Sequence, residues 1–176
     1  MSPILSALKQ LGCAFFDPGT ERPQRMSAAL AAINEQVRSV ALLAARLYLA
    51  DVFISSGLQK LRDWDSTLAL FEDYYHVPLL PPDLAAYVGA GGELLFPTLL
   101  VLGLGSRFAA AGLSVVNLMA ALSLPDIAPA ALRSHQLWGA LALAPLLWGA
   151  GRWSLDAWLA QRRTSPGSSS IGKQPV

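Results

Sequence analysis

The sequence predicts an all-α protein: a membrane four-helix bundle accompanied by amphipathic interfacial helices. Of its 176 residues, 53% are hydrophobic and only 14% are charged, whereas soluble domains carry about 25% charged residues. The apolar residues are also gathered into long blocks rather than scattered, which is typical of membrane proteins. Four of these blocks approach the length of a bilayer-spanning helix, and this number predicts the bundle.

The four apolar blocks are long enough, or nearly so, to cross the roughly 30 Å hydrocarbon core as helices. They define a membrane domain over residues 39–159, between an N-terminal extension (residues 1–38) and a C-terminal tail (residues 160–176). The tail is rich in Ser, Gly and Pro and is expected to be disordered. The expected spans are Ser39–Gly57, Leu84–Leu104, Phe108–Leu124 and Gln136–Ala150.

Two further segments have apolar residues at helical spacing. One precedes the first span, and the other lies in the long first loop. Both are expected to lie on the membrane surface as amphipathic helices, or else to cap the bundle. Their apolar positions are Met26, Leu30, Ile33 and Val37 in the first segment, and Leu68, Phe71 and Tyr75 in the second.

The basic residues predict the orientation. An even number of spans puts both termini on one side, and that side holds nine Lys and Arg residues against three on the other. The positive-inside rule therefore predicts a multi-pass protein of the bacterial inner membrane with both termini in the cytoplasm. The nine are Lys9, Arg22, Arg25, Arg38, Arg107, Arg152, Arg162, Arg163 and Lys173, and the three are Lys60, Arg62 and Arg133.

Several functional classes lack support in the composition. The net charge of +1 gives no basic field for nucleic acid. The single cysteine, Cys13, forms neither an internal disulfide nor a four-ligand zinc site. With only His76 and His135 besides, no metal or haem site is expected. Phosphate-binding loops and nucleophile elbows are also missing.

Strongly polar residues inside three of the expected spans mark the candidate site. Arg46 and Asp51 lie in the first span, Glu93 in the second and Asn117 in the third. At 1.5 Å per residue, Asp51 and Glu93 both lie roughly 16 Å from the inner end of their spans, and Asn117 roughly 14 to 15 Å. These groups form either a clasp that fixes helix packing or a site for binding or proton transfer.

Arg46 has two alternative roles. It pairs with Glu93 or Asp51 across the bundle, or it extends toward the cytoplasmic surface, since that end of its helix faces inward. Lys60 and His135 are expected at the outer mouth of the bundle. Pro97 has no amide hydrogen, so a kink is expected in the second span close to Glu93.

Three motifs in the membrane domain resemble the DoxX family of small four-helix membrane proteins. The first is Arg46 followed by "SSGLQKL", the second is "GGELLFPTLLVLGLGSRFAA" with Glu93, and the third is "GAGRWSLDAWL", ending in a Ser-Leu-Asp pattern that includes Asp156. Together they cover about residues 39–159. Pro97 is a departure from the family pattern.

The resemblance implies a subunit associated with quinone-linked oxidoreduction rather than an enzyme on its own. In that case the cofactor would be a quinone, not covalently bound, and the partners would be the bilayer and an oxidoreductase or other membrane-complex subunit. One alternative is a structural or assembly protein that recruits a partner. Another is a small transporter or exporter component, which would need to form oligomers, and a homo-oligomer stays open in each case.

Overall fold

The computed structural model describes residues 5, 6, 8 and 22–163, and this part of the chain is all-helical. Much of the N-terminal extension, and the tail from residue 164 onward, therefore lie outside the described residues. The helices are α2 (Arg22–Arg62), α3 (Trp64–Asp73), α4 (Pro82–Leu102), α5 (Ser106–Leu122), α6 (Pro129–Trp148) and α7 (Leu155–Arg163).

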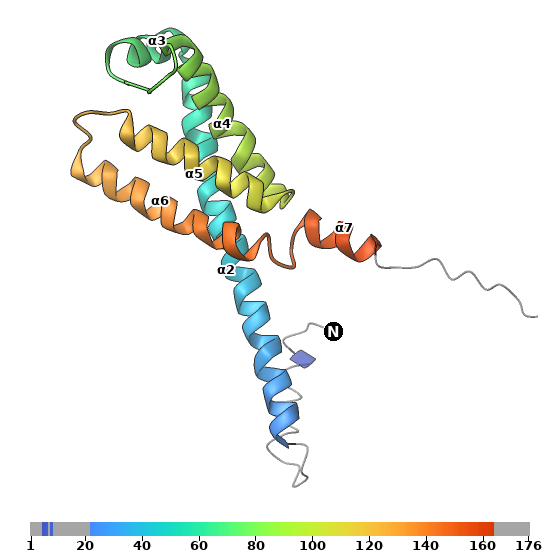
Figure 1. Ribbon diagram of the computed structural model, residues 1–176. Coiled ribbons are helices and arrows are strands. Elements are labelled where there is room, and N and C mark those ends of the chain that lie inside the picture. The colour runs from blue at the N-terminus through green and yellow to red at the C-terminus, as the bar shows by residue number, and fades with distance from the viewer. Residues whose placement is uncertain (1–4, 7, 9–21, 164–176) are drawn as a thin grey trace, which may run out of the picture.

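Helices α2, α4, α5 and α6 form the bundle (Figure 1). Their shared core contains Leu49 and Phe53 of α2, Leu100 of α4, Leu113 of α5 and Ala142 of α6, all at most 4% exposed. Helices α4 and α5 agree closely with the expected spans, whereas α6 begins at Pro129, before the expected start at Gln136. The fourth, α2, is much longer than its expected span.

Helix α2 has 41 residues and runs without a break through the expected amphipathic segment and the first expected span. The sequence between them contains neither proline nor glycine, so nothing interrupts the helix. At 1.5 Å per residue α2 is about 61 Å long. Its N-terminal part projects beyond the bundle, away from α4, α5 and α6 (Figure 1).

Helix α3 lies across the end of the bundle opposite to this projection (Figure 1). Asp63 caps its N-terminus by accepting a hydrogen bond from the Ser66 amide at 3.1 Å. Its apolar face, with Phe71, packs on Ala85 and Ala86 of α4. The second amphipathic segment is thus a cap on the bundle, which was one of its two expected roles.

Only α4, among the helices in the described part of the chain, is both long and apolar enough to cross a membrane by itself. Helix α5 is apolar but has 17 residues, and the bundle part of α2 carries Arg46, Asp51 and Lys60. Helix α4 continues through Pro97, and the Thr98 hydroxyl donates to the Leu94 carbonyl at 2.6 Å beside it.

Candidate functional site

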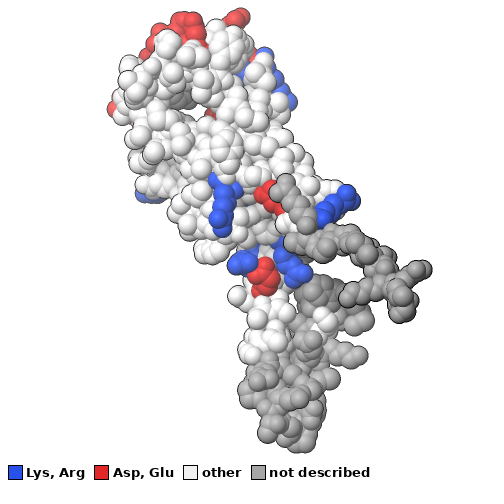
Figure 2. All heavy atoms as spheres, turned by 45° about the vertical axis from the view of Figure 1, so that its right-hand side comes forward, with Lys and Arg blue, Asp and Glu red and all other residues white. Residues whose placement is uncertain are grey.

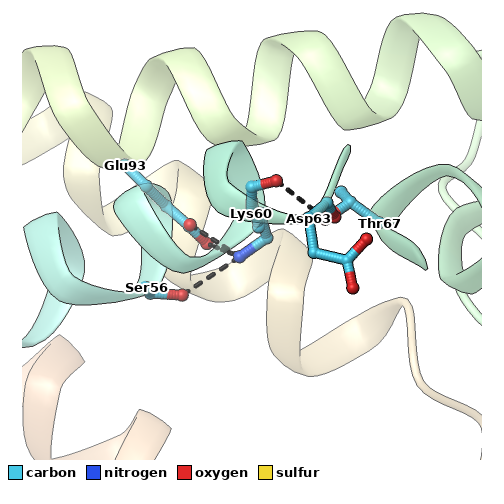
Figure 3. Close-up of polar contacts among 5 residues, drawn as sticks. All are labelled: Ser56, Lys60, Asp63, Thr67 and Glu93. Carbon is cyan, nitrogen blue, oxygen red and sulfur yellow. Dashed lines mark hydrogen bonds and ion pairs between the residues drawn. The ribbon is translucent and has the colours of Figure 1, made fainter. Parts of the chain in front are cut away.

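An ion pair between Lys60 and Glu93 joins α2 to α4 near the α3 end of the bundle (Figure 3). Lys60 Nζ lies 2.6 Å from Glu93 Oε2 and 2.9 Å from Oε1, and it donates to Ser56 Oγ at 3.0 Å. These contacts use all three ammonium protons. The Glu93 side chain is 8% exposed and that of Lys60 20% exposed, so the pair is largely shielded from solvent.

A glycine allows α2 and α4 to come close enough for this pair. A Cβ atom at Gly57 would lie 2.8 Å from Leu94 Cγ and 3.2 Å from Glu93 Cβ. Any larger residue would therefore push the two helices apart at the level of Glu93. This contact also fixes the register, because Glu93 stands beside residues 57–60 of α2 rather than beside Asp51.

The end of α2 is tied to α3 next to the pair. The buried Thr67 hydroxyl lies 3.1 Å from the Lys60 carbonyl and 2.9 Å from the Asp63 carbonyl (Figure 3). Helix α3 is thereby held over the Lys60–Glu93 pair. The cap and the ion pair form one structural unit.

An open pocket of about 430 Å³ lies between α3, the following loop and the start of α4. Its walls are apolar and aromatic, with a few polar groups, as is common in small-molecule sites. Burial raises the pKa of the Tyr75 phenol, and the nearby Glu93 charge raises it further. Tyr75 therefore lines the pocket within the electrostatic influence of Glu93. The lining residues are Phe71, Glu72, Tyr75, His76, Val77, Pro78, Leu80, Pro82 and Ala85.

A second polar pair joins α5 to α6. Asn117 Nδ2 donates to the His135 carbonyl at 2.9 Å, and His135 Nδ1 lies 2.9 Å from Asn117 Oδ1. With the amide oxygen as acceptor, Nδ1 carries the ring proton. The His135 ring packs edge-on against Trp138, at 5.0 Å between centroids, and Trp138 packs in the same way on Phe53.

Arg46 lies at the opposite end of the bundle and is 1% exposed. Its guanidinium donates to the carbonyls of Leu100 and Val101, at 2.6 and 2.9 Å, in the last turn of α4. It also donates to the carbonyls of Ala150 and Trp153, at 2.7 and 3.1 Å, between α6 and α7. Arg46 therefore joins the last turn of α4 to the segment between α6 and α7 through backbone carbonyls.

Asp156 of α7 complements Arg46 at this end. Its carboxylate accepts from the amides of Gly105, at 2.9 Å, and Ser106, at 3.1 Å, at the start of α5. Its own amide donates to the Gly103 carbonyl at 2.9 Å. Arg46 and Asp156 thus satisfy the two helix ends that meet at the α4–α5 turn, and we call them the inner hub.

The structure distributes the predicted site residues rather than gathering them. Glu93 pairs with Lys60, Asn117 pairs with His135, and Arg46 binds backbone carbonyls. Asp51 is exposed on the outer face of α2. The expected layer shared by Asp51, Glu93 and Asn117 assumed that the first span starts at residue 39. In the structure, Arg46 already lies level with the inner end of α4.

Three residues that act in these sites were not among the sequence candidates: Ser56, Tyr75 and Asp156. Asp156 belongs to the Ser-Leu-Asp motif that resembles the DoxX family, so this motif was a signal in the sequence that could have identified it. Lys60 and His135 were expected at the outer mouth, but the sequence did not predict that Lys60 bonds Glu93 and that His135 bonds Asn117. The described residues contain no group of three or more His, Cys, Asp or Glu arranged to hold a metal ion.

The fold and these pairs define an all-helical bundle with ionisable groups in its interior, and in a membrane protein such groups mark candidate functional sites. Residues 41–126, just under half of the chain, match the model of the DoxX family, which supports membership of this family. The family is membrane-associated, which supports a membrane location. The match includes Arg46, Lys60 and Glu93, whereas His135 and Asp156 lie beyond it.

One curated relative is an uncharacterized protein of Haemophilus influenzae. The two sequences are 38% identical over 81 residues, which cover 44% of this chain and 52% of that protein. The chain thus spans about half the length of this relative. No solved structure matches the chain.

Proposed function

We propose that α2, α4, α5 and α6 all cross the membrane, with both termini in the cytoplasm of a bacterium. The support is the outer surface of the bundle, where each of these helices exposes large apolar side chains. Such surface is far more extensive than a soluble monomer presents. Examples are Leu47 and Tyr48 of α2, Tyr87, Val88 and Leu95 of α4, Phe108, Val115 and Leu118 of α5, and Leu137, Leu143 and Leu147 of α6.

The charges support the same placement. Figure 2 shows acidic groups with some basic ones beside them at the α3 end, and charged groups of both signs around the opposite end, with a mostly uncharged band between the two ends. The second end carries Arg38, Arg107, Arg152 and Arg162. Basic residues on that side correspond to the cytoplasmic side of a membrane protein.

Within this placement, the chain serves as a quinone-proximal subunit of a redox-linked membrane complex. The observation that carries this proposal is the shielded Lys60–Glu93 pair at the same end of the bundle as the aromatic pocket, whose lining residue Tyr75 feels the Glu93 charge. The pocket fits a flat ring, since Phe71 and Tyr75 supply aromatic walls and His76 supplies a polar edge. A bound quinone would supply electron and proton transfer in partnership with an oxidoreductase.

The residues of this chain would bind and orient the ring and hold protons near it. The Tyr75 hydroxyl would donate a hydrogen bond to the ring, since a phenol is protonated at neutral pH. Glu93 is an acceptor at Oε1 and Oε2, and Lys60, whose three protons go to Glu93 and Ser56, fixes its position. Helix α3 limits the access of water from the outer side.

Extraction of the tagged chain from its own membranes in mild detergent tests this role. We expect a stoichiometric oxidoreductase subunit and bound quinone, measured by mass spectrometry. Tyr75→Phe and Glu93→Gln should lower the quinone per folded chain while leaving the partner bound. Glu35→Gln is the matched control, because Glu35 lies in the N-terminal part of α2, away from the pocket. A chain that elutes with bulk lipid alone, without partner or quinone, contradicts the proposal.

A structural or assembly role is the second candidate, and the inner hub favours it. Arg46 and Asp156 use their charges on backbone groups of α4, α5 and the α6–α7 segment, which holds helices together rather than binding a ligand. If the chain has this role, Glu93→Gln should weaken assembly of the membrane complex. The activity of the redox pathway should then fall only in proportion to the amount of complex that is lost.

A further inference from the structure

Three tryptophans gather around the end of α6 and the start of α7. Trp148 ends α6, Trp153 lies in the segment that links the two helices, and Trp158 lies in α7. Each is about half exposed, at 46% to 56%, whereas Trp64 and Trp138 are more buried. Tryptophan is enriched at the interface between a bilayer and water, because its ring is apolar while its indole N–H is polar.

Three exposed arginines lie on or beside the same segment. Arg107 of α5 donates from Nη2 to the Leu147 carbonyl at 3.2 Å, near the end of α6. Arg152 lies in the linking segment, and the Arg162 guanidinium stacks on the Trp158 ring, 3.6 Å from its centroid. Among the described residues, none of these three guanidinium groups forms an ion pair with a carboxylate. Their charges are therefore available to an anionic ligand.

The anchoring of α7 sets its height relative to the bundle. Asp156, in the first turn of α7, accepts from the Gly105 and Ser106 amides, so α7 begins level with the start of α5. From there α7 leads away from the side of the bundle (Figure 1), and in the described part of the chain no bundle helix packs extensively on it. In the membrane placement proposed above, this height is the inner surface of the bilayer.

The composition of α7 matches that of a helix bound to an anionic membrane surface. Leu155, Trp158 and Leu159 are exposed apolar side chains, and Arg162 follows them one turn later. Helices that lie in the membrane interface combine Leu and Trp with cationic residues, because burial of apolar area and attraction to anionic lipids both contribute to their binding. An uncharged surface would leave the three arginines without counterions.

We propose that α7 and the segment before it lie on the inner membrane surface and bind the phosphate groups of anionic phospholipids through Arg107, Arg152 and Arg162. A guanidinium binds phosphate through parallel hydrogen bonds, and the anionic inner leaflet attracts basic residues close to it. The tryptophans hold the segment at the depth of the headgroups. This inference rests on the proposed membrane placement but not on the quinone role.

The lipid site is bonded directly to the inner hub. Arg46 donates to the carbonyls of Ala150 and Trp153, which flank Arg152, and Asp156 accepts from the amides next to Arg107. Headgroups that hold this segment therefore also stabilise the contacts that close the ends of α4 and α5. Anionic lipid should accordingly raise the thermal stability of the bundle more than zwitterionic lipid does.

Reconstitution into vesicles of equal parts phosphatidylglycerol and phosphatidylcholine tests the lipid site. Native mass spectrometry of the chain extracted from these vesicles counts each lipid retained, and we expect phosphatidylglycerol to be enriched. Combining Arg152→Gln with Arg162→Gln should lower the ratio of the two bound lipids by about fivefold for each arginine removed. Arg62→Gln with Arg133→Gln is the matched control, because it removes the same charge from exposed positions at the other end of the bundle.

Thermal unfolding in mild detergent is the second measurement. Added phosphatidylglycerol should raise the midpoint temperature more than phosphatidylcholine does in the native chain and in the control, but not in the Arg152→Gln, Arg162→Gln variant. Equal lipid ratios in all three chains, or an equal loss in the control, would overturn the lipid site.

An alkaline carbonate wash of the same vesicles separates this inference from the membrane placement on which it rests. A chain that stays in the vesicles without enriching phosphatidylglycerol overturns the lipid site alone, and α7 is then covered by something other than anionic lipid. A chain that is washed off the vesicles contradicts the membrane placement, and this inference fails with it.

Discussion

Arg46 is almost fully buried, yet its four hydrogen-bond acceptors are all backbone carbonyls. Carbonyls at helix C-termini carry partial negative charge from the helix dipole, so they favour a cation without requiring a carboxylate. The planar guanidinium reaches several of them at once because its donors point in fixed directions. A buried arginine in a membrane protein can thus serve to close helix ends.

Arg46→Lys should destabilise the bundle, because an ammonium on a shorter stem cannot replace all four bonds. The loss of two bonds to a charged donor corresponds to about 3 kcal/mol. Thermal unfolding in detergent, followed by circular dichroism, measures this effect. Arg38→Lys is the control, since Arg38 is exposed and bonds Glu35 on the surface. A small and equal change for both variants would contradict this role of Arg46.

The contributions of Lys60 and Glu93 to the stability of the bundle should depend strongly on each other. Glu93→Gln or Lys60→Met each leaves a shielded charge without its counterion, which costs about 3 to 5 kcal/mol of unfolding free energy. The double variant should lose less than the sum of the two. A double-mutant cycle measures the coupling energy.

The Arg38–Glu35 pair provides the comparison for this cycle, as its contact is equally short at 2.6 Å but its side chains are 46% and 35% exposed. Its coupling should be about 0.2 to 1 kcal/mol. Equal coupling energies for the two pairs would mean that the shielding of Lys60 and Glu93 is lost in solution.

At the scale of elements, the start of α5 depends on a residue fifty positions away. Its N-cap residue, Gly105, has no side chain to accept from the first amides, and Asp156 supplies that acceptor instead. Asp156→Ala should therefore cost about 1 to 2 kcal/mol, the usual effect of losing a helix cap. Asp156→Asn keeps an acceptor oxygen and should cost less.

Hydrogen exchange of the Gly105 and Ser106 amides measures this effect locally, and faster exchange is expected in Asp156→Ala. The amides of α3 serve as the internal control, because they lie at the other end of the bundle. Exchange that rises equally in both places would indicate global destabilisation rather than loss of a cap.

The N-cap of α3 should be sensitive to pH. Hydrogen bonds from Ser66, first from its side chain and then from its backbone amide, lower the pKa of the Asp63 carboxyl below its ordinary value of 3.8. The stabilisation by the carboxylate is therefore fully present above pH 3.8 and is lost as the pH falls through the lowered pKa. Asp63→Asn should remove this dependence, since an amide does not titrate.

The chemical shift of the Ser66 amide proton, followed by NMR from pH 6 downward, reports this bond. Its midpoint should lie below 3.8 in the native chain, and the shift should stay nearly constant in Asp63→Asn. A midpoint pH at or above 3.8 would show that capping α3 does not lower the pKa of the Asp63 carboxyl.

The helices of the bundle could be predicted from hydrophobic blocks, since α4 and α5 begin and end within about two residues of the expected spans, although α6 begins at Pro129 rather than Gln136. The partners of the polar residues could not. An offset of several residues in α2 separates Asp51 from Glu93 and brings Lys60 to it instead. Hydropathy defines a block without defining the relative height of two helices, which here depends on the contact at Gly57.

At the scale of the whole molecule, α2 joins three environments. Its last turns hold the Lys60–Glu93 pair under α3, its middle holds Arg46 in the inner hub, and its first half projects beyond the bundle. An unbroken helix couples these levels mechanically, because rotation of α2 moves every residue on it. A partner bound to the projecting half would therefore affect the position of Lys60.

The proposed placement predicts which positions a membrane-impermeant maleimide reaches in intact cells. With Cys13→Ser as background, Glu72→Cys in α3 should be labelled from outside, because α3 lies on the outer end of the bundle. Arg162→Cys in α7 should be labelled only after lysis, because the inner hub holds α7 at the cytoplasmic end. Both side chains are exposed, so access rather than burial determines the outcome. Labelling of Arg162→Cys but not Glu72→Cys in intact cells would mean that the chain has the opposite orientation in the membrane. Labelling of both positions in intact cells would mean that the bundle does not separate the two sides of a membrane.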